Sequence, residues 1–314
     1  MRQNPMFPPK SDWVAPDTLP DLSSAKRIAI DLETKDPNLT TSGPGWATGD
    51  GYVTGFAIAT DKWSGYLPIR HEGGGNLDTG LVKRWLNKTL SSRCDKIFHN
   101  ALYDVGWLKR EDIQLNGKIH DTVIAAPLVN ENRRRYSLNI LGADYCGDIK
   151  DETLLREAAQ SYDVDPKSEM WRLPAKYVGE YAEQDAVLTL KLWDKLSKQL
   201  EKENLQSIYE LESNLIPLLI EMRWRGVRVD VNKAEQSVDE LKKQEQECIK
   251  QIKYKYGADV DVWASQSVAK AFDKAGLTYP RTKKTNAPSF TGQWLESLNH
   301  GLPKLIVQAR KYQK

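Results

Sequence analysis

Four acidic residues in three short segments have the types and spacing of a metal-binding cluster. Asp31 and Glu33 lie in IAIDLET, Asp104 lies in HNALYD, and Asp185 lies in YAEQDAV. Four carboxylates at one place would repel one another unless divalent cations held them together, and oxygen ligands in that number suit magnesium or manganese. Two such ions about 4 Å apart can clamp the attacking and leaving oxygens of a phosphodiester displacement. The alternative is that these acids are ordinary surface residues or helix caps.

The segments around the acids are expected to present them on matching faces. The apolar run before Asp31 predicts a buried strand over residues 27–32, and side chains alternate along a strand, so Asp31 and Glu33 share one face. Tyr181 and Asn100 each precede one of the other two acids by four residues, which is about one turn if the segment is helical. Tyr181 considered alone is more typical of a core aromatic than of a site residue, but its four-residue spacing from Asp185 favours the site.

Strand-like and helical patterns predict an α/β first half. Strands over 52–60 and 63–69 are expected to form a hairpin that turns at Asp61 and Lys62, after a long loop over 37–51. The remaining predicted elements of this half are a helix over 81–90, a strand over 96–100, and helices over 101–110, 121–129, 136–146, 151–162 and 177–203, the last with Pro174 in its first turn.

The second half is helical by pattern. An amphipathic helix is expected to end near Gly226, and a short extended piece leads to a helix N-cap at Asn232. A long helix over 233–256 follows, and Gly276 ends the next helix, WASQSVAKAFDKAGL. Asn286 lies in the turn of TKKTNAPSF, where an asparagine tolerates a positive φ.

In this order, the three acidic segments resemble the three motifs of the DEDD superfamily of 3′–5′ exonucleases, in the version with a tyrosine in the third motif. The resemblance covers roughly Arg27 to Trp193, and the part from Tyr209 onward resembles the start of the thumb of family A DNA polymerases. It implies a ribonuclease-H-like α/β fold, a mixed sheet flanked by helices, followed by a mostly α-helical thumb-like region. The expected domains are an N-terminal arm over 1–25, an exonuclease domain over 26–205 and an incomplete thumb-like region over 206–314.

The resemblance also implies a role for each acid. Asp31, Glu33 and Asp185 would bind the first of two Mg²⁺ or Mn²⁺ ions, with Asp31 bridging to the second and Asp104 acting on that ion through water. The hydroxyl of Tyr181 would orient the attacking water, and the product would be a nucleoside 5′-monophosphate released from a DNA 3′ end, as in proofreading during DNA replication.

Three neighbouring residues match motif positions that contact single-stranded substrate in the family. Thr34 would contact the terminal nucleotide, with Asn100 and Tyr103 beside it. An aromatic side chain stacks on a base at about 1–3 kcal/mol. Packing against the sheet is the alternative for Tyr103.

Several polar residues near the motifs have no assigned role. His99 stands where relatives carry an amide, so its function is open. Asp121 in HDT is more typical of a helix cap than of a ligand. The cluster Arg133–Arg135 is suited to phosphate binding, and a plain solvated loop explains it equally well.

Composition bounds the class of protein. With 314 residues, 28% of them charged, and no run of 18 apolar residues, the chain is expected to be soluble, with about two domains and no membrane span. The N-terminus lacks a signal-peptide core, and three distant cysteines without metal spacing predict free thiols in a reducing cytoplasm. The resemblance implies that this compartment is the cytoplasm of a bacterial cell or of a phage-infected host.

Charge is unevenly distributed along the chain. Residues 226–314 hold 16 Lys and Arg against 10 Asp and Glu, whereas the remainder holds 29 against 33. An acidic half followed by a basic half suits a metal site joined to a nucleic-acid-binding element. A solvated helical surface explains the same charges.

Two other functions compete with a DNA exonuclease. A ribonuclease-D-like RNA 3′-exonuclease shares the four acids and the tyrosine, but the thumb-like half argues against it. A non-catalytic module that grips DNA or a polymerase is the other alternative, and the intact acids argue against that. The expected partners are a single-stranded DNA 3′ end, a primer–template duplex bound through the C-terminal region, and a separate chain with polymerase palm and fingers, if one exists. Polymerase activity is not expected from this chain alone.

Overall fold

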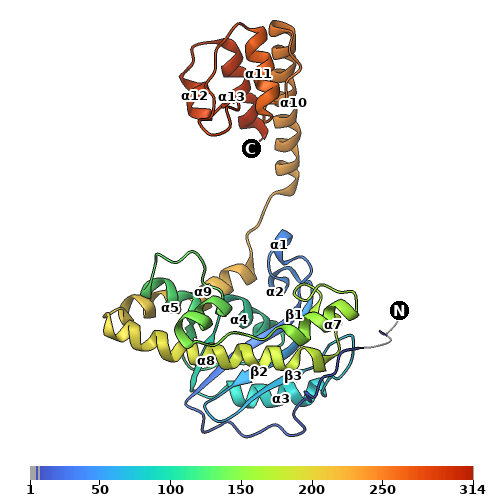
Figure 1. Cartoon of the computed structure of the whole chain (residues 1–314), viewed down its shortest axis with the longest axis vertical. Helices are drawn as coiled ribbons and strands as arrows, with labels where there is room; N and C mark the ends of the chain where they lie inside the picture. Colours follow the sequence, from blue (N-terminus) through green and yellow to red (C-terminus); the bar gives the residue numbers. More distant parts are fainter. Residues whose placement is uncertain (1–4, 6–7, 314) are drawn as a thin grey trace. The chain divides into compact units, whose positions relative to one another are not determined.

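The structure, a computed structural model, describes Pro5 and residues 8–313 (Figure 1). The chain forms two compact units, one ending at Gly226 and one beginning at Val227. Each unit has a hydrophobic core of its own.

A mixed five-stranded sheet forms the centre of the described part of the first unit. Its order is β3-β2-β1-β4-β5. The β1–β2 and β2–β3 pairs are antiparallel, whereas β1–β4 and β4–β5 are parallel. The strands are β1 (Arg27–Lys35), β2 (Tyr52–Ala59), β3 (Ser64–Pro68), β4 (Asp95–Phe98) and β5 (Ile119–Asp121).

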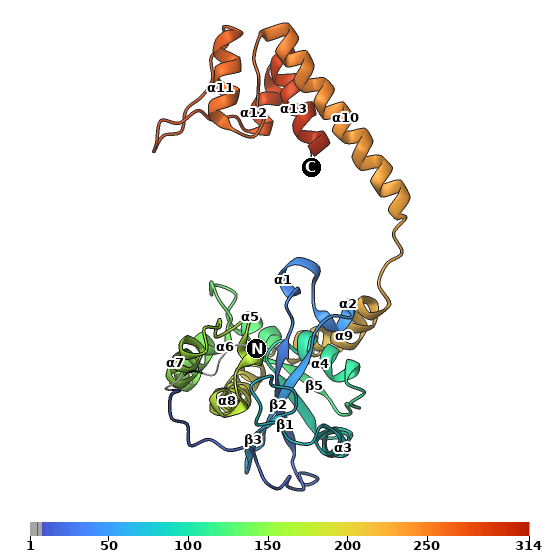
Figure 2. The same ribbon diagram turned by 90° about the vertical axis from the view of Figure 1, so that its right-hand side faces the viewer.

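Helices cover both faces of this sheet (Figure 2). The α-helices are α1 (Leu39–Ser42), α2 (Gly45–Thr48), α3 (Thr79–Leu90), α4 (Ala101–Arg110), α5 (Thr122–Val129), α6 (Leu138–Leu141), α7 (Thr153–Ser161), α8 (Gly179–Lys202) and α9 (Gln206–Arg225). A π-helix, η1 (Gly142–Cys146), and two 3₁₀ turns, η2 (Met170–Arg172) and η3 (Ala175–Tyr177), complete the unit.

The strands divide their side chains between two cores. Ala29 of β1 packs with α8 in one core, whereas Ile28 and Ile30 pack with α3 and α4 in the other. Because side chains alternate along a strand, residues 31 and 33 must face the same side as Ala29, toward α8. Helices thus pack on both faces of the sheet, which confirms the predicted fold class, a mixed sheet flanked by helices. Most strands and helices lie close to their expected positions.

Close backbone approaches hold the elements around β1. A Cβ on Gly55, which pairs with Glu33, would lie 2.2 Å from the Tyr66 hydroxyl. A Cβ on Gly106 of α4 would lie 2.2 Å from the Trp46 ring of α2. The pairing of β1 with β2 shifts register just after Glu33, and a bulge at that place re-aims the side chains beside it.

Two predicted features of the first unit were wrong, and one strand was missed. Residues 37–51 are not a plain loop, because they contain α1 and α2 and bury Trp46. Pro174 precedes the 3₁₀ turn η3, and the long helix begins five residues later at Gly179. Strand β5 was not predicted, since three residues carry too little pattern to be seen.

Helix α9 packs with the sheet-containing unit, although the expected exonuclease domain ended at 205. Tyr209, Ile216 and Ile220 are buried in the two cores of that unit. The Tyr209 hydroxyl accepts a hydrogen bond from the Asp121 backbone N–H at 2.9 Å. The helix therefore supports the end of β5, and its removal would expose this region.

The second unit is helical. It consists of α10 (Val231–Tyr256), α11 (Ser265–Lys274), α12 (Gly292–Ser297) and α13 (Gly301–Gln313), with α10 packed on α13. The predicted cap at Asn232 was wrong: Asp230 caps α10 by accepting from the Lys233 backbone N–H at 3.0 Å. Asn286 has φ 52°, as its turn was expected to require.

The N-terminal arm contacts α8 and the 3₁₀ turn η3 before it. The Trp13 indole donates to Glu183 at 2.8 Å, and Ser11 donates to the Lys176 carbonyl at 2.7 Å. Residues 1–4 and 6–7 of the predicted arm lie outside the described residues. Within the described chain, none of the helices has the length and apolar character that crossing a membrane requires.

Candidate active site

Three of the four predicted acids meet between β1 and α8. Asp31 and Glu33 come from one face of β1, and Asp185 comes from the second turn of α8. One carboxylate oxygen from each residue lies within 4.8 Å of the others. Asp185 is buried, and the two strand acids are half-buried, so water or a substrate phosphate can reach the cluster from one side.

Asp104 lies beside this group without being part of it. Its carboxyl is buried near the start of α4, and the charges of Asp31 and Glu33 act on it. Asp121 positions α4, because its carboxylate accepts from the backbone N–H groups of Asn100 at 2.9 Å and Ala101 at 2.8 Å. It also accepts from Val123 at 2.8 Å, so the prediction that Asp121 is a helix cap is confirmed.

The carboxylates raise one another's affinity for protons. Burial and then the charge of Asp185 raise the pKa of Asp31 to about 8. Burial and then Asp31 raise the pKa of Glu33 and of Asp104 well above their ordinary values. Burial likewise raises the pKa of Asp185. Deprotonating the whole cluster therefore requires compensating positive charge.

Divalent cations fit this donor set. Carboxylate oxygens are the hard ligands that Mg²⁺ and Mn²⁺ prefer, and three of them already lie within 4.8 Å of one another. Asp31 and Glu33 form no ion pair with any Lys, Arg or His among the described residues, which leaves their oxygens available.

One cation of the chain itself reaches the cluster, and the sequence analysis missed it. Lys150 forms an ion pair with Asp185, and its side chain is 4% exposed. Its Nζ lies 4.1 Å from the centre of the Tyr181 ring. Lys150 stands in an irregular segment between η1 and α7, where no periodic pattern indicates which way a side chain points.

Tyr181 lies one turn before Asp185 on α8 and faces the same cluster. Burial, followed by the charges of Asp185 and Glu33, raises its pKa above the ordinary tyrosine value. The phenol therefore stays protonated at neutral pH and can donate a hydrogen bond.

Two predicted substrate residues are joined by a hydrogen bond. The hydroxyls of Thr34 and Tyr103 lie 2.7 Å apart, and the Tyr103 hydroxyl donates to Asp36 at 3.0 Å. Asn100 is exposed and adopts φ 81° as the residue before α4. It therefore does not share a helical face with Asp104, contrary to the expectation from their spacing.

Of the remaining open residues, His99 and Arg133 have structural partners. His99 Nδ1 lies 2.8 Å from the Thr122 hydroxyl, and burial followed by the charge of Lys150 lowers its pKa to about 4, so it is neutral. Arg133 pairs with Asp144, whereas Arg134 and Arg135 are exposed.

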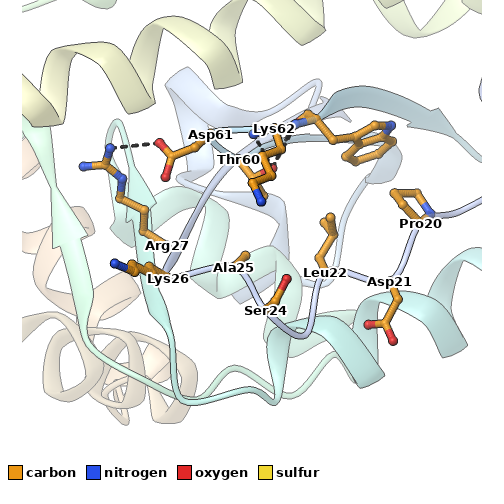
Figure 3. Close-up of a pocket in the computed structure, with 11 residues that line it drawn as sticks. Pro20, Asp21, Leu22, Ser24, Ala25, Lys26, Arg27, Thr60, Asp61 and Lys62 are labelled. Atoms are coloured by element: carbon orange, nitrogen blue, oxygen red, sulfur yellow. Dashed lines mark hydrogen bonds and ion pairs between the residues drawn. The ribbon is translucent and has the colours of Figure 1, made fainter.

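A separate hollow of about 520 Å³ lies between residues 20–27 and the β2–β3 turn (Figure 3). Arg27 at its rim pairs with Asp61 at 2.9 Å. None of the four acids lines it, so it has no part in the chemistry of the cluster.

Comparison with known proteins places this geometry in a family. A model of 3′–5′ exonuclease domains of the DNA polymerase A type matches residues 14–201. The chain belongs to this exonuclease family. The matched range contains all four acids and Tyr181, and the resemblance seen in the sequence is thereby confirmed.

Relatives of this exonuclease-family chain include DNA polymerases. It is 38% identical over 99% of its length to a DNA-directed DNA polymerase of Pseudomonas phage M6, of which it covers 48%. It is 25% identical to DNA polymerase I of Pseudomonas aeruginosa, over 94% of the chain and 32% of that protein. The chain thus spans half the length of these relatives or less. A Pol1 polymerase domain from M. smegmatis, solved with primer-template and dNTP, shares the fold with TM-score 0.67 at 20% identity, over 93% of the chain and 45% of that structure.

The raised acid pKa values predict how pH affects the metal-free exonuclease-family chain. Asp31 titrates near 3.8 when unfolded and near 8 when folded, so the folded state binds more protons between these values. The contribution of Asp31 to the free energy of unfolding is therefore present at low pH and is lost as the pH rises toward about 8. Urea unfolding in chelator should show this loss, and Asp31→Asn should reduce it by at least about 1.4 kcal/mol, the equivalent of one pKa unit. If the free energy of unfolding of wild type differed from that of Asp31→Asn by the same amount at every pH, this prediction would be contradicted.

Proposed function

We propose that the chain is a divalent-cation-dependent 3′–5′ exodeoxyribonuclease that releases nucleoside 5′-monophosphates in the manner of a proofreading domain. The observation that carries this proposal is the convergence of Asp31, Glu33 and Asp185 within 4.8 Å, in a chain of the exonuclease family. The polymerase identity of its relatives favours DNA as the substrate.

The acids divide their roles by position. The charge of Asp31 acts on Glu33 and Asp104, the charge of Glu33 also acts on Asp104, and Asp185 acts on both strand acids. We assign Asp31, Glu33 and Asp185 to one cation and Asp31 with Asp104 to a second. When bound, Mg²⁺ or Mn²⁺ ions lower the pKa of a water nucleophile and offset charge on the leaving oxygen.

Tyr181 orients the attacking water in this proposal. Its hydroxyl lies on the cluster side of α8 and remains protonated, so it donates toward an oxygen placed beside Asp185. A phenol held by a helix one turn from a ligand is a fixed donor, and fixed donors lower the cost of aligning a nucleophile.

The 3′ end of the DNA substrate would lie along Thr34 and Tyr103. Asp36 and Thr34 hold the Tyr103 hydroxyl, while Trp107 packs edge-on at a ring distance of 6.4 Å. The Tyr103 ring is thus held rigidly and is half-buried, which suits stacking on one unpaired base. Asn100 is exposed beside it and offers an amide to the sugar or phosphate.

The proposal is tested by end-labelled substrates with Mg²⁺, Mn²⁺ or chelator. Single-stranded DNA and mismatched primer ends should be shortened from the 3′ end with release of 5′-monophosphates, and chelator should stop the reaction. Cleavage of single-stranded RNA in preference to DNA would favour the ribonuclease-D-like alternative. Binding of DNA without metal-dependent cleavage would favour the alternative that the chain is a non-catalytic binding module.

The second unit is proposed to bind duplex DNA by its charge. Residues 227–314 carry 16 Lys and Arg against 10 Asp and Glu. Lys283 and Lys284 lie in an exposed turn, which Arg281 closes by donating to the Asn286 carbonyl at 2.9 Å. Exposed basic side chains on a fixed turn contact phosphates without reading sequence. A separate polymerase palm-and-fingers chain remains a further proposed partner.

Ending the chain after Gly226 should preserve cleavage of single-stranded DNA and weaken duplex binding. The cut falls between the two units, whereas a cut near Lys202 would remove the buried Tyr209 and Ile216 of α9. Filter binding across salt concentrations should show a smaller salt slope for the truncated chain, by about 0.9 for each lost phosphate contact. Full-length Lys283→Ala/Lys284→Ala is the matched comparison, with a slope reduced by up to about 1.8. Unchanged duplex affinity and slope after truncation would rule out this role.

A further inference from the structure

Lys150 occupies a place in the carboxylate cluster that the proposed exonuclease chemistry does not use. Its ammonium pairs with Asp185 and lies over the Tyr181 ring, with the side chain almost fully buried. Burying a lysine is unfavourable unless its charge is compensated, so this placement depends on the acids.

The charge of Lys150 acts on three of the four acids. It favours the ionised forms of Asp31 and Glu33 as well as that of Asp185. His99 is neutral, so it contributes no charge from the neighbouring side. Asp31, Glu33, Asp104 and Asp185 have no ion-pair partner other than Lys150 in the described chain. Lys150 therefore does for Asp31, Glu33 and Asp185 what a bound cation would do.

A divalent cation on Asp185 and the Lys150 ammonium compete for the same carboxylate. Asp185 belongs to the three-residue donor set, and its Oδ1 is the atom in contact with Lys150. Two cations on one small carboxylate repel strongly when both are shielded from water. Binding the metal should therefore expel the ammonium.

An open hollow adjoins Lys150 and can receive the expelled side chain. It measures about 400 Å³ and is lined by Asp151 and Glu152 together with Arg156 and Lys167. Glu152 already pairs with Arg156 and accepts from the Asn139 amide at 3.2 Å. The two acids give the ammonium new partners in a solvated position.

We propose that Lys150 is an internal counter-ion that holds the carboxylate cluster in the metal-free state and leaves it when a divalent cation binds. Lys150 thereby sets the cation concentration at which the site fills. This inference rests on the proposed metal-dependent function and concerns how that site is regulated.

Calorimetric titration of the full chain with MnCl₂, without DNA, tests the competition. Lys150→Met should bind the first ion on the order of tenfold more tightly than wild type, because no internal cation must be expelled; this corresponds to about 1.4 kcal/mol. Lys150→Arg keeps the charge and should resemble wild type. Lys167→Met, an exposed lysine of the same hollow, should also resemble wild type.

A measurement on wild type alone covers the case in which Lys150→Met does not fold. Lysine acetylation followed by mass spectrometry should label Lys150 slowly in chelator and faster with saturating Mg²⁺, while Lys167 labels equally in both. Unchanged labelling of Lys150, or an unchanged or weaker cation affinity of Lys150→Met, overturns the inference while leaving the proposed function intact. A wild-type chain that binds no divalent cation overturns both.

Discussion

Asp31→Ala is expected to abolish exonuclease turnover, with a loss of at least about a thousandfold, because several kcal/mol of charge stabilisation depend on the cations it would hold. Asp31 is the carboxylate whose charge reaches both Glu33 and Asp104. Its removal should not lower the stability of the metal-free chain, since it relieves repulsion among crowded acids. Single-turnover cleavage of single-stranded DNA and thermal unfolding in chelator measure the two effects.

The matched control is Glu180→Ala, which removes an exposed acid from the same helix as Asp185. It should leave both the cleavage rate and the thermal stability near wild type. Adding Mg²⁺ should raise the unfolding temperature of wild type and of Glu180→Ala but much less that of Asp31→Ala. A near-full cleavage rate in Asp31→Ala would show that the metal assignment is wrong.

Tyr181→Phe is expected to slow cleavage by roughly 10- to 1000-fold, the range of a single positioned hydrogen-bonding group. The ring remains, so its packing is kept, as is its contact with Lys150 in the metal-free chain, and only the protonated hydroxyl is lost. Cation affinity should be unchanged, because the phenol is not a metal ligand in this proposal. Single-turnover rates and calorimetric titration with Mn²⁺ check the two expectations.

Tyr103→Phe provides the comparison within the same site. It removes the hydrogen bonds to Thr34 and Asp36 but keeps the ring that would stack on a base. Its loss of rate should be smaller than that of Tyr181→Phe. An unchanged single-turnover rate in Tyr181→Phe would reduce this residue to core packing.

Elements with a strong local pattern were predictable. The helix predicted over 101–110 is α4 with the same ends, and the predicted hairpin is β2 and β3 with its turn at Asp61 and Lys62. In these segments the hydrophobic period and the turn residues agree with the tertiary packing, so local and global preferences coincide.

Elements determined by distant contacts were not predictable. Helix α2, within residues 37–51, is held where Trp46 packs against Gly106, which lies about sixty residues away in the chain. The cap of α10 is Asp230 rather than Asn232, although both residue types cap helices well. Composition alone does not choose between two good caps two residues apart.

For the candidate site, the sequence by itself determined which acids are present and which of them share a face. The alternation along β1 requires Asp31 and Glu33 to point the same way, and the helical period places Tyr181 one turn before Asp185. Only the tertiary structure decided that α8 crosses the face of β1 that carries these acids, that Asp104 stays beside the group, and that Lys150 enters it. Local periodicity sets the direction of a side chain within its own element, but the distance between charges on different elements depends on packing across the core, and that distance determines their pKa values and their partners.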